Sequence, residues 1–345
     1  MRSDVSPDHI LQIGMGFWAS KTLLSAVELG LFTALADGPR TGADLEAALE
    51  LHPRATYDFL DALVALGLLE RTGQGDEGLD EGLYANTPAT AAFLDRASPT
   101  YIGGILEMAN ARLFRFWADL TPALQTGRPQ NEVRHGGKSM FDALYADPAR
   151  LEQFMDAMSG VSMANFDAFS RSFDFSGYRT MVDIGGATGQ LSCFVASNQP
   201  HMRCASYDLP VVQPIAQRRI QEAGLADRVT AGIIDFFDDE FPAADVITMG
   251  MILHDWNLPA KKMLIEKAYR ALPEGGAFVA IENIIDDERR QNIFGLLMSL
   301  NMLIEFGEAF DFTGADFRSW CLEAGFSRCE IMPLRGPASA AIAYK

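Results

Sequence analysis

The sequence predicts an α/β protein in which a doubly wound, Rossmann-like domain with a C-terminal β-hairpin follows a mainly α-helical winged-helix domain. Three observations predict this arrangement. From Arg179 onward short apolar strands alternate with helices, whereas the first hundred residues have the pattern of three helices and a short hairpin. Residues 181–192, MVDIGGATGQLS, form an apolar strand that turns on glycines into a helix. The length of 345 residues suits two domains rather than one.

Composition and charge narrow the classes of function. The chain is 48% hydrophobic and 21% charged, as expected of a protein with a large core. Its formal net charge of −18 argues against nucleic acid or an anionic membrane as the main partner, because both require basic patches. We find no secretory signal pattern and no apolar run long enough to span a bilayer, so we expect a cytoplasmic protein. The cysteines have no CxxC spacing and are expected to be reduced thiols: Cys193, Cys204, Cys321 and Cys329.

The N-terminal segment predicts a helix that is apolar around more than one face. Ser6, Pro7 and Asp8 form a typical helix start. The apolar residues that follow cover more of the helix than one buried stripe requires: Ile10, Ile13, Met15, Phe17 and Trp18. Such a helix is either buried within its own domain or packed into a partner subunit.

The next segments complete a winged-helix pattern. Gly30 breaks one apolar helix, a cap at Thr41 begins a short second one, and Pro53 opens a third. Two short strands then flank a loop rich in glycine and acid. The expected elements are helices at 23–35, 41–49 and 54–66, and strands at 68–71 and 83–84.

A winged helix can bind DNA, but the charge of this one argues against it. Residues 1–100 contain six basic and fifteen acidic residues, and the would-be recognition helix carries one arginine against Asp58 and Asp61. Phosphate contacts require several Lys or Arg side chains on one face. We therefore expect a dimerisation scaffold rather than a transcriptional regulator.

Residues 99–170 predict a helical connector. Two apolar helices lie within 99–126, a further helix begins at 139–141, and a longer one runs from Pro148 to about Phe169. These helices carry methionine and phenylalanine at helical spacing. Such residues suit a packed core, but they also suit the wall of a pocket for a flat, polarizable ligand, and both interpretations stay open.

The C-terminal half alternates strands and helices as a parallel sheet requires. Its strands are apolar on both faces, which indicates burial between two helical layers. The expected strands are 180–184, 203–207, 229–234, 246–251 and 277–284, with helices at 190–198, 211–223 and 259–271 between them. Helices at 292–306 and 313–324 and a hairpin of 329–334 with 339–343 complete the domain.

The glycine-rich turn decides between two kinds of nucleotide-like ligand. A dinucleotide fingerprint needs glycine at its first, third and sixth positions, but Ala187 and Gln190 occupy two of them. The pattern acid-x-Gly-x-Gly-x-Gly matches better, through Asp183, Gly185 and Gly189. A carboxylate beside the turn repels phosphate but suits an ammonium and a sulfonium group. This favours S-adenosylmethionine over a dinucleotide.

Acidic residues also end the next two strands. Asp208 follows the second strand, where an acid can accept both hydroxyls of a ribose. Asp235 ends the third strand and would take the adenine amino group, while Phe236 would stack on the ring. Each acid alone is a weak signal, because strand-end acids commonly cap helices. Acids at three successive strand ends jointly indicate one ligand site, because ligands bind at the carboxyl ends of such sheets.

His254 follows the fourth strand in the motif HDW. It is either a satisfied histidine at a strand end or a general base, since an imidazole with a pKa of about 6.5 accepts a proton near neutral pH. Glu282, at the end of the fifth strand, is expected beside it as the carboxylate that orients the ring. The other histidines offer no ligand spacing near His254, so we expect no metal site.

With these motifs the sequence resembles the S-adenosylmethionine-dependent O-methyltransferases of the caffeate and acetylserotonin type, especially bacterial members that act on natural products. The motifs that carry the resemblance are VDIGGATG, SYDLP, IIDFF, HDW, VAIEN and TGADFRSWCLEAGF. It covers nearly the whole chain and implies a dimerisation domain at 1–98, a connector lining the substrate pocket at 99–170 and a catalytic domain at 171–345. It implies a homodimer that moves a methyl group from S-adenosylmethionine to a hydroxyl of a small, aromatic acceptor and releases S-adenosylhomocysteine.

The resemblance also assigns roles to residues. His254 would deprotonate the acceptor hydroxyl, with Glu282 and Asp311 flanking it. The residues that would hold the cofactor are Asp183, Gly185, Gly186, Asp208, Leu209, Asp235, Phe236, Trp256, Met158 and Ser162. The residues that would line the acceptor pocket are Phe141, Met158, Met302 and Trp18, the last because the first helix in this family reaches toward the partner's pocket.

Two positions depart from the family pattern. The acid aligned with Asp311 is usually glutamate, and Gly250 stands where plant members often carry a lysine that contacts the cofactor. Methyl transfer to nitrogen or carbon stays open as an alternative, as does a relative that binds the cofactor without transferring its methyl group. The pairing of His254 with Glu282 favours a hydroxyl acceptor, because such relatives can dispense with a base.

Overall fold

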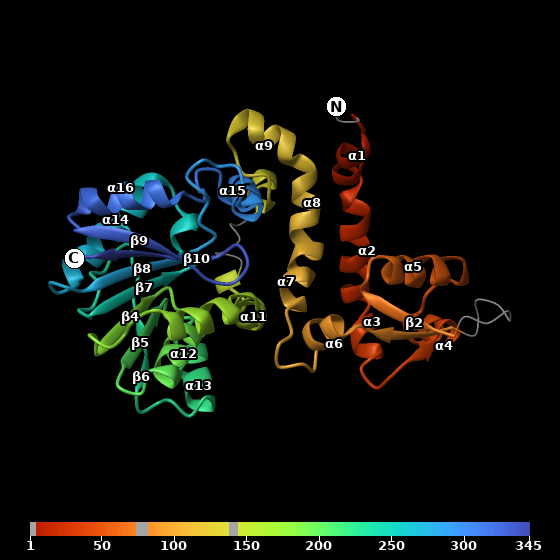
Figure 1. Cartoon of the computed structure of the whole chain (residues 1–345), viewed down its shortest axis with the longest axis horizontal. Coiled ribbons are helices and arrows are strands. Elements are labelled where there is room, and N and C mark those ends of the chain that lie inside the picture. The colour runs from red at the N-terminus through yellow and green to blue at the C-terminus, as the bar shows by residue number, and fades with distance from the viewer. Residues whose placement is uncertain (1–4, 74–81, 138–143) are drawn as a thin grey trace. The chain divides into compact units, whose positions relative to one another are not determined.

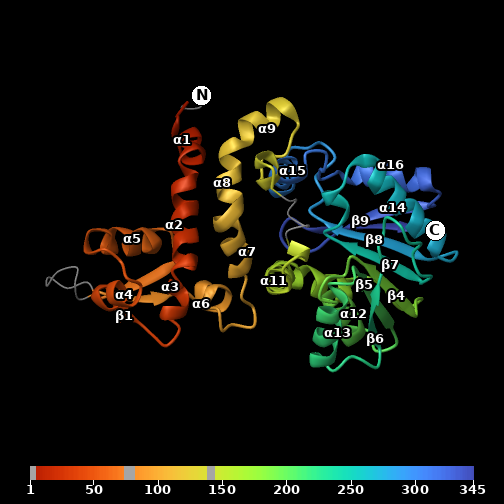
Figure 2. The same cartoon turned by 180° about the vertical axis from the view of Figure 1, so that it is seen from behind.

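The computed structural model describes residues 5–73, 82–137 and 144–345 (Figures 1 and 2). The chain divides into two compact units, Met1–Arg115 and Phe116–Lys345. Each unit has a hydrophobic core of its own. Within the described ranges, no helix combines the length and the apolar character that crossing a bilayer requires.

The first unit is a helical domain with a small antiparallel sheet. Its strands pair in the order β1-β3-β2, so the expected hairpin gains a third strand of two residues. The strands are β1 (Arg40–Thr41), β2 (Leu69–Thr72) and β3 (Leu83–Asn86). The helices are α1 (Asp8–Gly14), α2 (Gly16–Glu28), α3 (Leu31–Ala34), α4 (Gly42–Ala48), α5 (Pro53–Ala65), α6 (Pro88–Leu94), α7 (Gly103–Met108) and the π-helix η2 (Ala109–Leu113). The three-residue α8 (Phe114–Phe116) leads into the second unit.

The N-terminal helix is divided where the sequence pattern predicts continuity. The apolar residues between Ile10 and Trp18 are shared by α1 and α2, which meet at Met15. Gly14 and Gly16 on either side weaken helix propensity there, which explains the break. The side chains of this segment are largely solvent-exposed, up to 74% for Ile10. The burial of this helix within its own domain, one of the two expectations, is therefore wrong.

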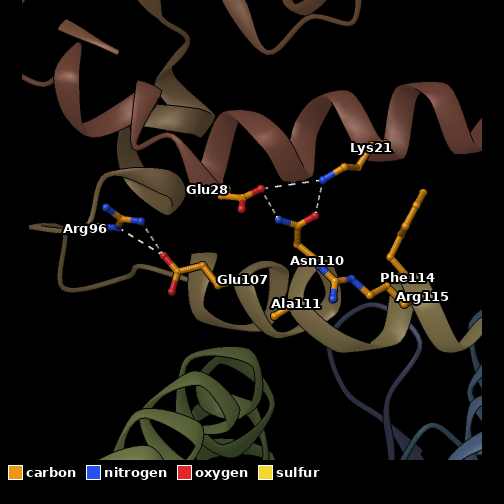
Figure 3. Close-up of a pocket in the computed structure, with 8 residues that line it drawn as sticks. All are labelled: Lys21, Glu28, Arg96, Glu107, Asn110, Ala111, Phe114 and Arg115. Atoms are coloured by element: carbon orange, nitrogen blue, oxygen red, sulfur yellow. Dashed lines mark hydrogen bonds and ion pairs between the residues drawn. The ribbon is translucent and has the colours of Figure 1, made fainter. Parts of the chain in front are cut away.

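A cavity of about 610 Å³ lies in the first unit beside α2 and α7 (Figure 3). Lys21 of α2 donates to Asn110 Oδ1 at 2.6 Å, and Asn110 Nδ2 donates to Glu28 at 2.6 Å. A second pair, Arg96 and Glu107, closes at 2.9 Å. The contacts of Asn110 join α2 to the α7–η2 segment. Each charged group in these contacts thus has a polar or charged partner within the first unit.

The second unit contains the predicted doubly wound sheet and its terminal hairpin. The strand order is β6-β5-β4-β7-β8-β10-β9. The first five strands run parallel, and β10 and β9 are antiparallel, so the sheet is mixed. The strands are β4 (Thr180–Ile184), β5 (Arg203–Asp208), β6 (Val229–Ile233), β7 (Val246–Gly250), β8 (Ala277–Glu282), β9 (Arg328–Pro333) and β10 (Ser339–Tyr344).

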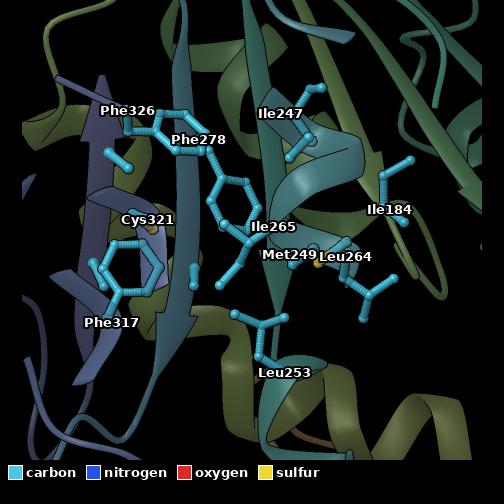
Figure 4. Packing of buried hydrophobic residues seen from close by; sticks show 14 of the residues in the cluster. Ile184, Ile247, Met249, Leu253, Leu264, Ile265, Phe278, Phe317, Cys321 and Phe326 are labelled. Atoms are coloured by element: carbon cyan, nitrogen blue, oxygen red, sulfur yellow. The ribbon is translucent and has the colours of Figure 1, made fainter. Parts of the chain in front are cut away.

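Helices cover both faces of this sheet, as the apolar strands predict. Successive residues of a strand alternate between two cores: Met181 packs against α11, α12 and α13, and Val182 packs toward α14 and α16. Figure 4 shows the second core, to which Leu264 and Ile265 of α14 and Phe278 of β8 all contribute. The helices are η3 (Trp117–Asp119), α9 (Leu120–Thr126), η4 (Glu132–His135), α11 (Pro148–Ser172), α12 (Gln190–Asn198), α13 (Gln213–Glu222), η5 (Leu253–Asp255), α14 (Leu258–Ala271), α15 (Ile293–Phe306) and α16 (Gly314–Ala324).

Candidate active site

The glycine-rich turn joins β4 to α12. Gly185 and Gly189 have φ of 72° and 75°, a backbone conformation that glycine adopts without steric cost. A Cβ at Gly186 would lie 2.2 Å from Ser206 Oγ and 2.8 Å from Asp183 Oδ2. These positions therefore keep the turn compact and leave bare backbone at the end of the sheet, which is the surface that a nucleoside ligand needs.

Asp183 lies beneath this turn and is 3% exposed. Its Oδ1 accepts a hydrogen bond from Thr248 Oγ1 at 2.7 Å. Burial raises the pKa of Asp183 to about 7, and the charge of Asp208 adds to the rise against the opposing hydrogen bond. A cation placed beside Asp183 would stabilise the ionised form, so the site suits a positively charged ligand group.

Asp208 ties the turn to the end of β5. Its Oδ2 accepts from the Ala187 N–H at 2.9 Å and its Oδ1 from the Leu209 N–H at 2.7 Å. Burial raises the pKa of Asp208, while these two hydrogen bonds lower it. Each carboxylate oxygen keeps a further lone pair, so Asp208 can still accept hydrogen bonds from a pair of ligand hydroxyls.

An aromatic wall lies past the end of β6. The rings of Phe236 and Trp256 meet edge to face at 5.8 Å, and Phe237 lies 4.7 Å from Trp256. Asp235 accepts the Phe237 N–H at 3.0 Å, which fixes the turn after the strand. The Trp256 Nε1 is buried and has no hydrogen-bond partner among the described residues. A flat ligand ring fits beside such a wall, and an acceptor on it would satisfy the indole N–H.

His254 lies in the short helix η5 after β7 and is 6% exposed. Its Nδ1 is 3.4 Å from Asp311 Oδ1 and 3.7 Å from Glu282 Oε2. Its Nε2 is 3.2 Å from Asp255 Oδ1, a contact that the sequence motifs do not predict. Met251, three residues before His254, has a positive φ of 57°. This backbone conformation is uncommon for a residue other than glycine and produces a sharp turn. Both nitrogens of the ring therefore face carboxylates.

Glu282 also holds the turn that carries His254. Its Oε1 accepts the N–H groups of Ile252 and Leu253 at 3.1 and 2.9 Å. Burial raises the pKa of Glu282 to about 7, while the charge of His254 lowers it. Burial also lowers the pKa of His254, but the charges of Glu282 and Asp255 outweigh this effect and raise it well above 6.5. The cluster thus holds a proton strongly on the imidazole.

The same three residues could form a metal site by spacing alone. Ligand atoms of His254, Glu282 and Asp311 lie within 4.8 Å of one another. Two features favour a proton site instead. Backbone N–H groups already occupy Glu282 Oε1, and the buried ammonium of Lys261 lies in the field of the same carboxylates.

Comparison with known proteins places this geometry in a family. Residues 117–327 match the O-methyltransferase domain, and residues 11–96 match the O-methyltransferase dimerisation domain. The chain belongs to the O-methyltransferase family. The enzyme is a methyltransferase whose methyl donor is S-adenosylmethionine.

Three relatives illustrate the range of the family. The methyltransferase is 40% identical over 339 residues to the tetracenomycin polyketide synthesis 8-O-methyl transferase TcmO of Streptomyces glaucescens, with 98% of this chain and 97% of that protein covered. It is 37% identical over 318 residues to the N,N-dimethyltransferase OxyT of Streptomyces rimosus, at 92% and 90% coverage. The crystal structure of human N-acetylserotonin methyltransferase in complex with S-adenosylmethionine has a TM-score of 0.89 at 29% identity and covers 100% of this chain and 99% of that one.

The structure brings together most of the site residues that the sequence predicts. Asp183, Gly185, Gly186, Asp208, Leu209, Asp235, Phe236, Trp256, His254, Glu282 and Asp311 all lie at or beyond the carboxyl ends of the parallel strands or on the facing segment before α16. Met158 and Ser162 are half-buried on α11, and Met302 is 6% exposed on α15. Trp18 is 63% exposed on α2 of the first unit. Phe141 lies outside the described residues.

Gly250 of the methyltransferase faces an aromatic ring. A Cβ at this strand-end position would lie 3.0 Å from two ring atoms of Phe166. The space that a larger side chain would require here is therefore taken by α11. The departure from the family pattern at Gly250 is thus accompanied by the ring of Phe166 close to it, which the sequence alone does not reveal.

Sequence reasoning missed two buried lysines on α14 and one tyrosine. Lys267 donates to the backbone oxygens of Phe236, Phe237 and Asp239 at 2.9, 2.9 and 2.7 Å. Lys261 is fully buried and donates to the Trp256 oxygen. The signal was available, because Lys261 shares the buried helical face of Leu264, Ile265 and Ala268. Burial raises the pKa of Tyr145, and the charges of Asp208 and Asp255 add to the rise.

Proposed function

We propose that the enzyme transfers the methyl group to a hydroxyl of a small aromatic natural-product intermediate, with His254 as general base. The observation that carries the proposal is the histidine at the carboxyl end of the sheet, whose Nδ1 lies 3.4 Å from Asp311 and 3.7 Å from Glu282. The likeness to TcmO, whose name describes 8-O-methylation in polyketide synthesis, supports a polyketide-like acceptor. S-adenosylmethionine supplies an electrophilic methyl group when bound.

The proposed mechanism assigns proton transfer and positioning to this chain. His254 accepts the proton of the acceptor hydroxyl, and Glu282 and Asp311 stabilise the resulting imidazolium. Asp208 and the glycine turn would hold the donor, which would supply the methyl group to the acceptor oxygen. Holding two reactants in line contributes about 7–11 kcal/mol at most, and a positioned base adds roughly 10²–10⁴-fold.

The assignment of the remaining parts follows from the same proposal. Residues 1–98 form the dimerisation domain, 99–170 the connector that lines the acceptor pocket and 171–345 the catalytic domain. The active protein is a homodimer that uses the exposed apolar residues of α1 and α2, with Trp18 reaching the partner's pocket and Met302 lining the chain's own.

A second candidate is transfer to nitrogen. The likeness to OxyT, named as an N,N-dimethyltransferase, favours it. An amine acceptor depends less on a base, because a neutral amine attacks before it loses its proton. The buried His254–Glu282 pair favours the hydroxyl.

Mass spectrometry distinguishes the candidates. The enzyme is incubated with S-adenosylmethionine and matched pairs of fused-ring phenols and the corresponding aromatic amines. The proposal expects products heavier by one methylene from the phenols, with equimolar S-adenosylhomocysteine. Methylation of the amines alone would establish the second candidate and reject the first.

A further inference from the structure

Lys261 is a fully buried amine that the proposed mechanism does not use. It lies in the first turns of α14 among the apolar residues of the core. Burying an ammonium group is costly unless charges or hydrogen bonds compensate for the lost water. The surroundings of this amine therefore show what stabilises it.

The contacts of Lys261 connect two segments of the site. Its Nζ donates to the backbone oxygen of Trp256, two residues after His254. The same Nζ lies 3.9 Å from the centre of the Phe310 ring and 5.9 Å from that of Phe312, the two neighbours of Asp311. One side chain thus holds the segment that carries the base and the segment that carries a flanking acid.

The charge of Lys261 also acts within the cluster. Burial lowers its pKa to about 8, while the carboxylates of Glu282, Asp311 and Asp255 oppose the fall. Interactions between charges are reciprocal, so the ammonium acts on those carboxylates, which in turn act on the imidazole. Three acids thus lie against the imidazole, Lys261 acts on all three, and Tyr145 lies in the field of one of them: Glu282 on β8, Asp255 on η5, Asp311 before α16, Lys261 on α14 and Tyr145 before α11.

We propose that Lys261 is a positioning residue of the active site: it fixes the His254 turn against the Asp311 segment, and its positive charge offsets part of the negative charge that favours the protonated form of His254. The proposal rests on His254 acting as the base. Three carboxylates alone would hold a proton on the imidazole, and an imidazole that already carries its proton accepts no other. A buried cation beside the carboxylates lowers the proton affinity of the imidazole.

The test compares three lysines of α14 that differ in their surroundings. Lys261→Met removes the charge and keeps the length. Lys267→Met removes the other buried lysine, which holds the Phe236 loop, and Lys262→Met removes a surface lysine paired with Glu323. The proton on His254 is followed by NMR of carbon-13-labelled histidine. One of only five histidine signals is assigned by its loss in His254→Asn.

The expected result is specific to Lys261→Met. The titration midpoint of His254 rises by about one pH unit, because the carboxylates beside the ring lose the cation that offsets them. With a phenolic acceptor, kcat/KM then falls about tenfold at neutral pH and recovers toward the wild-type value at alkaline pH. Lys267→Met weakens binding of S-adenosylhomocysteine in calorimetry without moving the midpoint, and Lys262→Met changes neither.

Other outcomes would overturn the proposal. An unmoved midpoint with an activity loss that is equal at every pH assigns Lys261 a structural role only. If Lys261→Met fails to fold, Asp255→Asn is compared with the double variant Lys261→Met/Asp255→Asn, and equal midpoints in these two contradict the charge argument. A His254→Asn variant with full turnover would instead refute the base itself, which separates failure of the proposed function from failure of this inference.

Discussion

His254 is surrounded by more negative charge than a proton acceptor requires. One carboxylate would orient the ring, yet Asp255, Glu282 and Asp311 all lie within 3.7 Å of its nitrogens. The acids stabilise the imidazolium that forms after proton transfer, but they also favour it before the transfer. The pKa of His254, raised well above its ordinary value, reflects this second effect. At the residue scale, the activity therefore depends on how the whole cluster shares its charge.

Replacing the base tests its role directly. We expect His254→Ala to lower kcat by roughly 10²–10⁴-fold, the contribution of a positioned general base. Binding of S-adenosylhomocysteine should change little, because the glycine turn and Asp208 stay intact. Calorimetry and steady-state kinetics measure the two effects separately. His201→Gln, at a histidine that contacts the Phe175 oxygen 26 residues away in sequence, is the matched control and should keep full activity. Equal turnover in both variants would remove His254 from the mechanism.

Replacing Asp311 should shift the pKa of His254 in the direction opposite to that expected for replacing Lys261. Asp311→Asn removes a negative charge 3.4 Å from Nδ1, so the pKa of His254 falls and the acid limb of kcat/KM moves to lower pH. The maximal rate falls about tenfold, because the imidazolium loses one stabilising charge. Asp311→Glu keeps the charge and should keep the limb in place. If the acid limb of kcat/KM moved to higher pH in Asp311→Asn, the electrostatic description of the cluster would be contradicted.

At the scale of elements, α14 is a shared support for two loops. Lys261 binds the segment after His254, and Lys267 binds the Phe236–Phe237 segment. The glycine turn, in contrast, is fixed by its own backbone and by Asp208. Met251, which leads into η5, has a positive φ that the surrounding structure must enforce. The loops of the site are thus held by the α14 lysines and, at the glycine turn, by Asp208.

The glycine turn can be tested with a matched pair of substitutions. Gly185 and Gly224 both have positive φ, of 72° and 69°, so alanine strains either backbone by about 1–2 kcal/mol. A Cβ at Gly185 would also lie 2.5 Å from Ile252, beside the His254 turn, whereas Gly224 has open space. We expect Gly185→Ala to weaken S-adenosylhomocysteine binding at least about tenfold and Gly224→Ala to leave it unchanged. Calorimetry at one temperature measures both, and equal effects would show that only backbone strain matters.

The elements also show which features a sequence predicts. The order of strands, the glycine turn and the strand-end acids follow from local patterns, so they could be located in advance. The break at Met15 and the two-residue strand β1 depend on weak local preferences and were missed. Asp255, Lys261 and Tyr145 could not be assigned, because their roles arise where segments distant in the chain approach each other. Lys261 shows the exception, since a lysine on an apolar helical face already signals a buried charge.

At the scale of the whole molecule, the exposed apolar surface of the first unit needs a partner. Ile10, Ile13 and Trp18 are 74%, 67% and 63% exposed, and contiguous apolar surface of this kind marks an interaction site. The segment from residue 11 belongs to the part that matches the dimerisation domain. The high negative charge makes the protein repel copies of itself elsewhere on the surface, so association is confined to apolar areas.

Light scattering tests this surface. We expect the double variant Ile10→Asp/Ile13→Asp to convert a dimer into a monomer, because two charges on each copy would be buried without partners. Leu322→Asp, at an apolar residue 50% exposed on α16, is the control and should stay dimeric. A double variant that remains dimeric would show that the dimer uses another surface.

The contact between Gly250 and Phe166 makes two positions interdependent in evolution. A Cβ gained at Gly250 would lie 3.0 Å from the Phe166 ring on α11, so the ring must shift to make room for it. A smaller residue at position 166 removes that barrier but leaves a void until position 250 is filled. The order of substitutions therefore matters: a lineage can acquire a large residue at position 250 only after position 166 on α11 has acquired a smaller one. Laboratory evolution that varies the two codons together would recover the paired substitutions, whereas libraries that vary one position at a time would not.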